Sequence, residues 1–198
     1  MNKLSPIRID STINSDIIDR CHEQFKADLA PKGERPHLGE REIFIPFVWM
    51  DDHKSEIFWH IASIEKKDDR LPILPCANDR ASAICKENCI YGEWLIYPRG
   101  EERAACLFRA MRVEWIRQII DLFNYHDAHV KYWEKINSNK KNRIYLRYQE
   151  EENDYLIVFE EKSSKRVILI TAFPVFFRSA KRDYDNDYNA YVHSQKKQ

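Results

Sequence analysis

Hydrophobic and polar positions near the N-terminus alternate with the period of a helix. Between Ser11 and Ala30, apolar side chains recur at steps of three and four residues, at Ile13, Ile17, Ile18, Cys21, Phe25 and Leu29. This spacing places them on one face of an α-helix. Pro31 and Gly33 follow and are expected to end it. The pattern therefore predicts an amphipathic N-terminal helix.

The next two apolar segments are predicted to be strands. Residues 41–50 are rich in β-branched and aromatic side chains, but Pro46 confines them to a sheet edge or to two short strands. Residues 56–64, E-I-F-W-H-I-A-S-I, follow a polar turn and contain few polar residues that would face water. Such a run is typical of a buried strand.

Residues 65–100 have no clear hydrophobic period. They contain three prolines close together and three of the five cysteines of the chain. We expect an irregular, Cys-containing insertion here. Helical character returns between Glu101 and Tyr125, where a broad apolar face is interspersed with arginines. Residues 126–141 are polar and favour a short helix followed by a loop.

The segment from Arg143 to Phe177 predicts a three-strand meander. R-I-Y-L-R-Y alternates like a half-buried strand, whereas D-Y-L-I-V-F and V-I-L-I-T-A-F are continuous apolar runs, as in central strands covered on both faces. Turn-forming residues separate the three runs. After Phe177 the chain is polar, with tyrosines 184, 188 and 191 at helical spacing. This leaves two alternatives, a short docking helix or a frayed tail.

These elements together predict one α+β domain over residues 1–198. Its parts are an N-terminal helix and strands (1–64), the irregular Cys-containing insertion (65–100), a helix packed on a small, mainly antiparallel sheet (101–181) and a polar tail (182–198).

Composition narrows the function classes. Hydrophobic residues make up 43% of the 198 residues, so a disordered chain is not expected. Lys plus Arg and Asp plus Glu each total 32, so no net field indicates a nucleic-acid or membrane partner, although a local basic patch is compatible with this balance. With four glycines, the chain contains neither a P-loop nor a dinucleotide-binding fingerprint.

The chain also lacks the usual signals for export or membrane insertion. The N-terminus carries charge where a secretory signal would be apolar, and no run approaches the ~18 apolar residues of a membrane span. We therefore expect a cytoplasmic protein with no membrane partner.

Four cysteines raise the question of a metal site. Cys76, Cys85, Cys89 and Cys106 could, with His53 or His60, form a tetrahedral structural zinc site. Their spacing contains no C-x-x-C pair, so buried thiols are the favoured interpretation and structural zinc the alternative. No cofactor is expected to take part in catalysis.

The second half of the chain resembles a family of nucleases. An arginine-bearing helix followed by R-I-Y-L-R-Y, D-Y-L-I-V-F and I-L-I-T-A-F-P-V is similar to the barnase, EndoU, colicin and RelE-like superfamily of phage and mobile-element toxins. The resemblance covers residues 101–181, with F-W-H-I-A-S upstream as a weaker match. It implies a helix packed on a small antiparallel sheet, and RNA cleavage without metal by scattered polar residues.

The resemblance also implies catalytic residues. T-A-F-P matches the T-A-Y-P pattern of the family's final strand and indicates Thr171, whereas Phe173 replaces the tyrosine and removes its hydroxyl. R-V-E-W-I matches the helix start R-I-x-W-I and indicates Arg112. His60 is a weaker correspondence. Transesterification at the 2′-hydroxyl needs an acid, a base and fixed cations, and His60 could supply either proton-transfer group.

Four further residues are expected to bind the substrate. Arg117 or Arg147 would grip a phosphate beside Arg112, and Lys181 or Tyr184 would contact the RNA backbone. Each of these side chains also has an ordinary structural interpretation, such as a solvated helix face or a hydrogen bond within a strand.

The sequence therefore favours a toxin-like or phage-associated, metal-independent ribonuclease. RNA is the expected substrate, and an inhibitor or immunity protein an expected partner; the oligomeric state is not indicated. One alternative is a non-catalytic phage or mobile-element module that binds a protein, favoured by the zero net charge and by Phe173. Another is a zinc-stapled nucleic-acid-binding protein.

Overall fold

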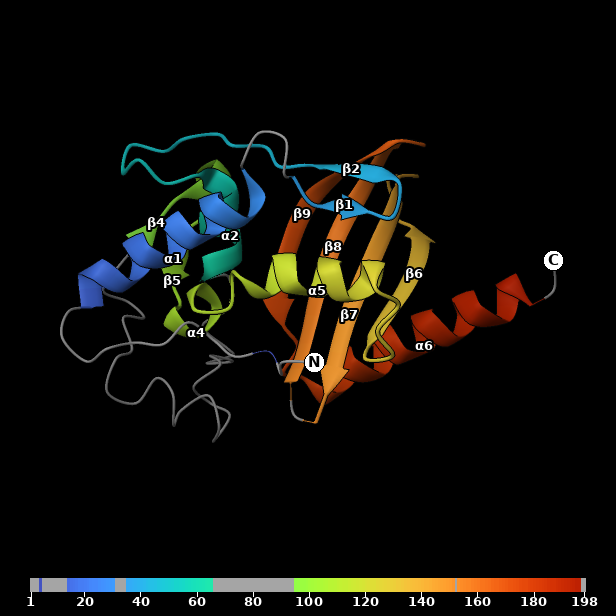
Figure 1. Ribbon diagram of the computed structural model, residues 1–198. Coiled ribbons are helices and arrows are strands. Elements are labelled where there is room, and N and C mark those ends of the chain that lie inside the picture. Colours follow the sequence, from blue (N-terminus) through green and yellow to red (C-terminus); the bar gives the residue numbers. More distant parts are fainter. Residues whose placement is uncertain (1–3, 5–13, 31–34, 66–94, 152, 197–198) are drawn as a thin grey trace. The chain divides into compact units, whose positions relative to one another are not determined.

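The computed structural model describes residue 4 and residues 14–30, 35–65, 95–151 and 153–196 (Figure 1). The α+β class is confirmed. No helix within these ranges is long and apolar enough to cross a membrane.

The chain forms two compact units, each built from two segments. Unit 1 comprises Met1–Gly33 and Phe47–Trp115, and unit 2 comprises Glu34–Pro46 and Ile116–Gln198. The chain therefore leaves unit 1 after its first helix and returns to it before completing unit 2. The single domain expected over residues 1–198 stays a prediction.

The N-terminal helix of unit 1 is confirmed. Helix α1 spans Asn14–Leu29. Its apolar stripe is buried from Ile17 to Leu29, with Cys21 and Phe25 between them.

Helix α2 (Glu56–Ala62) shows that the strand predicted over residues 56–64 is wrong. Ser55 caps the helix, and its hydroxyl accepts a hydrogen bond from the backbone N–H of Phe58 at 3.3 Å. Ile57 and Phe58 are buried, as are Ile61 and Ala62 one turn later. The continuous apolar run concealed this helical period, which periodicity alone does not resolve in so short a segment.

A small sheet completes the described part of unit 1. Strand β3 (Ser63–Glu65) pairs antiparallel with β5 (Arg103–Ala105), which also pairs with β4 (Leu95–Ile96). The 3-10 helix η2 (Pro98–Gly100) lies between β4 and β5. Residues 66–94, most of the predicted Cys-containing insertion, lie outside the described ranges.

The helix predicted from Glu101 to Tyr125 is only partly confirmed. It is preceded by β5 and divided into α4 (Leu107–Ala110) and α5 (Trp115–Asn124) by a turn. Arg112 lies in that turn, so it does not start the long helix as expected.

Unit 2 is built on a six-stranded sheet with the order β1-β2-β9-β8-β7-β6. The predicted meander is confirmed as β7 (Asn142–Glu150), β8 (Asn153–Ser163) and β9 (Arg166–Pro174), all antiparallel. Strands β1 (His37–Leu38) and β2 (Arg41–Phe44) add a hairpin. Because β2 runs parallel to β9, the sheet is mixed.

The remaining edge of the sheet corrects another prediction. Residues 126–141 were expected to form a short helix and loop, but Val130–Ile136 form strand β6. Its sequence V-K-Y-W-E-K-I places β-branched and aromatic residues among charged ones, which suits an edge strand.

The two faces of this sheet are covered by different helices (Figure 1). Phe123 of α5 stacks on Tyr132 of β6, whereas α6 (Arg178–Gln195) places tyrosines around Trp133, the next residue of the strand. Successive strand residues point to opposite faces, so α5 and α6 lie on opposite sides. The docking-helix alternative for the tail is thereby confirmed. Below, "the α6 face" means the sheet face that carries Trp133.

Candidate functional site

His60 lies in the last turn of α2 in unit 1. Burial and the nearby charges of Arg103, Arg99 and Arg109 lower the pKa of its imidazole from 6.5 to about 4. The ring is therefore neutral near pH 7. Arg103 also donates to the carbonyl of His60 at 3.3 Å, and Arg109 donates to the carbonyl of Ser63 at 2.7 Å. Both arginines thus satisfy carbonyls at the end of the helix, which is a structural use of their donors.

Arg112 is buried in the turn between α4 and α5. Its Nη1 donates to the carbonyl of Phe108 at 2.8 Å, and its guanidinium lies 3.5 Å from the ring centroid of Phe108 and 5.1 Å from that of Trp115. This setting favours a packing role. His60 and Arg112 belong to unit 1 and Thr171 to unit 2, so the three predicted catalytic residues do not fall within one unit.

The structure does bring together three of the predicted substrate-binding residues. Arg147 is fully buried, and its Nε and Nη2 donate to the two carboxylate oxygens of Asp154 at 2.8 and 2.7 Å. Its Nη1 donates to the carbonyl of Lys181 at 3.2 Å and to Asp185 at 3.1 Å. Tyr184 lies beside it, with its ring centroid 5.8 Å from the guanidinium. This arrangement attaches α6 to the sheet and leaves Arg147 closed to a phosphate.

The remaining predicted binding residues that the structure describes, Arg117 and Cys106, contact residues of their own segments or are buried. Arg117 on α5 pairs with Asp121 one turn later, at 3.1 Å. Cys106 is buried beside α4, whereas Cys76, Cys85 and Cys89 lie outside the described residues. Within the described ranges, no three His, Cys, Asp or Glu side chains converge to hold a metal. The structural zinc site stays a prediction.

Thr171 is positioned by the register of the meander. It pairs with Val158, and Val158 pairs with Tyr145. Two residues along the same strands, Arg143 pairs with Glu160. Paired residues share a sheet face, as do residues two apart, so all five lie on the α6 face. A β-bulge between Val158 and Phe159 interrupts the pairing of β8 with β9, so Thr171 and Glu160 share this face without being regular diagonal neighbours.

A basic group surrounds Glu160 at this end of the sheet. The Glu160 carboxylate is contacted by Arg143 at 2.9 Å, by Lys141 at 3.1 Å and by Lys162. Burial opposes ionisation, but hydrogen bonds from Lys162 and Lys141 and the charge of Arg143 hold the pKa of Glu160 below its usual value. We call these four residues the Glu160 cluster.

The Glu160 cluster has surplus positive charge and is partly open to solvent. Three cations meet one carboxylate, and Glu160 is only 3% exposed, whereas the side chains of Lys141 and Lys162 are 52% and 42% exposed. The sequence reasoning missed this group. The signal that could have found it is the two-residue spacing of 141 with 143 and of 160 with 162 on the predicted strands.

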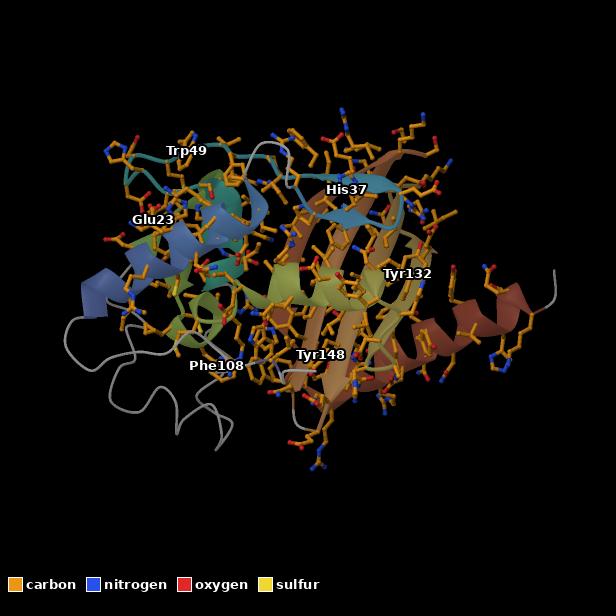
Figure 2. The ribbon with its side chains drawn as sticks, viewed as in Figure 1. Glu23, His37, Trp49, Phe108, Tyr132 and Tyr148 are labelled. Atoms are coloured by element: carbon orange, nitrogen blue, oxygen red, sulfur yellow. The ribbon has the colours of Figure 1, made fainter. Side chains whose placement is uncertain are left out.

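A second polar group lies on the face covered by α5, where Figure 2 shows Tyr132. Arg41 of β2 donates to the Tyr132 hydroxyl at 3.1 Å and to Glu134 at 3.0 Å. Asn142 donates to Glu134 at 2.7 Å and to Glu161 at 2.9 Å. Strands β2 and β6 are separated by three other strands in the sheet, yet Arg41 of β2 reaches side chains of β6. The sheet is therefore curled. With two carboxylates and one cation, the group does not favour phosphate.

Comparisons with models of protein families, with curated proteins and with solved structures found no match to this chain. Membership of the nuclease superfamily therefore stays a prediction from the sequence segments quoted above.

Proposed function

We propose that this protein is a toxin-like ribonuclease that cleaves RNA without metal at the Glu160 cluster. The observation that carries the proposal is the meeting of three cations with one buried carboxylate, on the sheet face that also carries Thr171. It supports the proposal because the cluster lies on the segment that resembles the nuclease superfamily, and because an excess of fixed cations attracts RNA phosphates.

The cluster would catalyse cleavage by stabilising the negative charge that develops on the phosphate in the transition state. When the 2′-hydroxyl of RNA loses its proton and its oxygen attacks the adjacent phosphorus, the bond to the 5′-oxygen breaks and a 2′,3′-cyclic phosphate forms. The 5′-oxygen takes up a proton and leaves as a hydroxyl. Lys141, Lys162 and Arg143 would stabilise the negative charge that the phosphate gains, and Thr171 would donate a hydrogen bond to a phosphate oxygen. Glu160 would also position the three cations, since it contacts all of them.

Glu160, the carboxylate within the cluster, is the candidate that accepts the proton of the 2′-hydroxyl. Glu160→Gln tests this, because loss of the proton acceptor lowers kcat with little change in KM. His60, the imidazole indicated by the sequence, belongs to unit 1, and His60→Gln tests that expectation separately.

The test is cleavage of total RNA and tRNA by the purified protein in excess EDTA. We expect cyclic phosphate ends, and at least a hundredfold lower rate in the double variant Lys141→Gln/Lys162→Gln, as for the loss of transition-state donors in other enzymes. Lys165→Gln, in the exposed β8–β9 turn, is the matched control and should retain activity. Arg112→Ala and Thr171→Val test the residues indicated by the resemblance.

A second candidate is a non-catalytic binding module. It is favoured by the burial of Arg112 and Arg147, which were both expected to grip phosphate. Wild-type protein that binds RNA through the Glu160 cluster but leaves it intact under all buffer conditions would support this candidate over the enzyme.

A further inference from the structure

Helix α6 contacts the sheet through several ion pairs, although none of its residues is fully buried. Asp185 contacts Lys131 and Arg147, each at 3.1 Å, and Asp187 contacts Lys135 at 2.8 Å. In these contacts the carboxylate belongs to the helix and the cation to the sheet.

Aromatic contacts add to these ion pairs. Tyr184, Tyr188 and Tyr191 are partly buried against a cluster that contains Trp133 and Leu156. The indole N–H of Trp133 is buried there without a hydrogen-bond partner. An unsatisfied buried donor weakens the packing that α6 provides, because its desolvation is not offset by a hydrogen bond.

The cations under α6 continue the Glu160 cluster. Lys135 pairs in register with Arg143, and Lys131 pairs with Arg147, four residues further along both strands. All four side chains therefore lie on the α6 face. The sheet carries one basic stripe. Helix α6 pairs with the cations of one part, whereas Lys141 and Lys162 of the Glu160 cluster stay partly exposed.

We propose that α6 is an autoinhibitory helix: Asp185 and Asp187 form ion pairs with Lys131 and Lys135, which would otherwise bind the phosphates of an RNA strand. The inference rests on the proposed function, because it concerns access to the same basic stripe. RNA competes with α6 for Lys131 and Lys135, so displacement of the helix extends the binding surface from the Glu160 cluster along β6.

The experiment compares the wild-type chain with Asp185→Asn/Asp187→Asn. Asp183→Asn is the matched control, since Asp183 is an exposed residue of the same helix. Anisotropy of a labelled single-stranded RNA is measured over a range of salt concentrations, and amide hydrogen exchange reports the attachment of α6 without RNA. We expect at least tenfold tighter RNA binding in the double variant and faster exchange in α6. The slope of log affinity against log salt should steepen by about 1 to 2, for two freed cations.

The control should match the wild type in every measurement. Unchanged exchange in α6, or faster exchange without tighter binding, would overturn the proposal. Heparin serves as a second probe, because it is a polyanion without a ribose hydroxyl to attack. Tighter heparin binding by the double variant, together with no cleavage of RNA by any form of the protein, would uphold autoinhibition by α6 and reject the ribonuclease.

Discussion

At the residue scale, the ion pair of Arg147 with Asp154 joins the interior of the sheet to helix α6. Their side chains are 0% and 4% exposed, the most buried ion pair among the described residues. Two parallel hydrogen bonds join them, and the remaining donors of the guanidinium reach α6. A buried ion pair of this kind contributes little net stability compared with an apolar pair of similar volume. Removal of one partner is nevertheless strongly destabilising, because it leaves the other charge buried without a counter-charge.

Asp154→Ala should therefore lower the free energy of unfolding by about 3–5 kcal/mol. Urea unfolding followed by far-UV circular dichroism measures the loss. Asp183→Ala, on the exposed side of α6, should change stability by less than about 0.5 kcal/mol. A loss below about 1 kcal/mol in Asp154→Ala would mean that Arg147 finds another partner or water.

At the scale of elements, the stability of helix α2 depends on the residue that caps it. Its seven residues are too few to form a stable helix alone, so tertiary packing and the cap at Ser55 must maintain it. The backbone N–H of Ser55 also donates to His22 of α1 at 3.1 Å, which fixes the start of the helix against its neighbour.

Ser55→Ala should cost about 1 kcal/mol, because the N–H of Phe58 loses its acceptor at a buried position. Ser55→Thr keeps a capping oxygen and is expected to recover most of that stability, although its added methyl must be accommodated. Thermal and urea unfolding of both variants measures the difference. Equal stability of Ser55→Ala and the wild type would show that packing alone maintains α2.

The elements that could be predicted from sequence are those with a long, clear period. Helix α1 and the three strands of the meander have such patterns, and their turns are marked by polar residues. Helix α2 and strand β6 were missed because each is seven residues long and its pattern fits either structure. The pairing of β2 with β9 has no local signal, since it joins residues 42–44 with residues 166–168.

The same limit applies to the candidate site. Thr171 was indicated by a short motif, whereas the meeting of Glu160 with Arg143 depends on strand register, which the sequence does not specify. Arg147 was expected to grip a phosphate beside Arg112, since its guanidinium offers paired donors. Its burial follows from the docking of α6, which is a tertiary event.

At the scale of the whole molecule, the two units differ in their response to acid. Burial lowers the pKa of His22 and of His60 to about 4, and both residues belong to unit 1. The unfolded chain then binds protons that the folded unit excludes, so stability is lost as pH falls from about 6.5 to 4. In unit 2 the pKa values of Glu134 and Glu160 are lowered, and the stability that this provides is lost below about pH 4.5.

Unit 1 should therefore lose structure at a higher pH than unit 2. Pulsed hydrogen exchange after incubation between pH 7 and pH 3 checks this, with peptides from α2 reporting unit 1 and peptides from β8 and β9 reporting unit 2. In His22→Gln, which keeps a hydrogen-bond acceptor for Ser55, the loss between pH 7 and 4.5 should be smaller by about 2–3 kcal/mol. Simultaneous exchange in both units, or an unaltered profile in this variant, would contradict the assignment.

The parallel pairing of β2 with β9 has a consequence for biosynthesis. A ribosome releases β2 early, but its partner strand emerges more than a hundred residues later. The sheet of unit 2 therefore cannot be completed until β9 has left the ribosome, after the strands β6 and β7 that carry the basic stripe. Helix α6 follows β9 directly, so the segment that covers the stripe leaves the ribosome just after the sheet that carries it. In the cell that makes it, the protein would pass through only a brief interval in which this surface is assembled and uncovered.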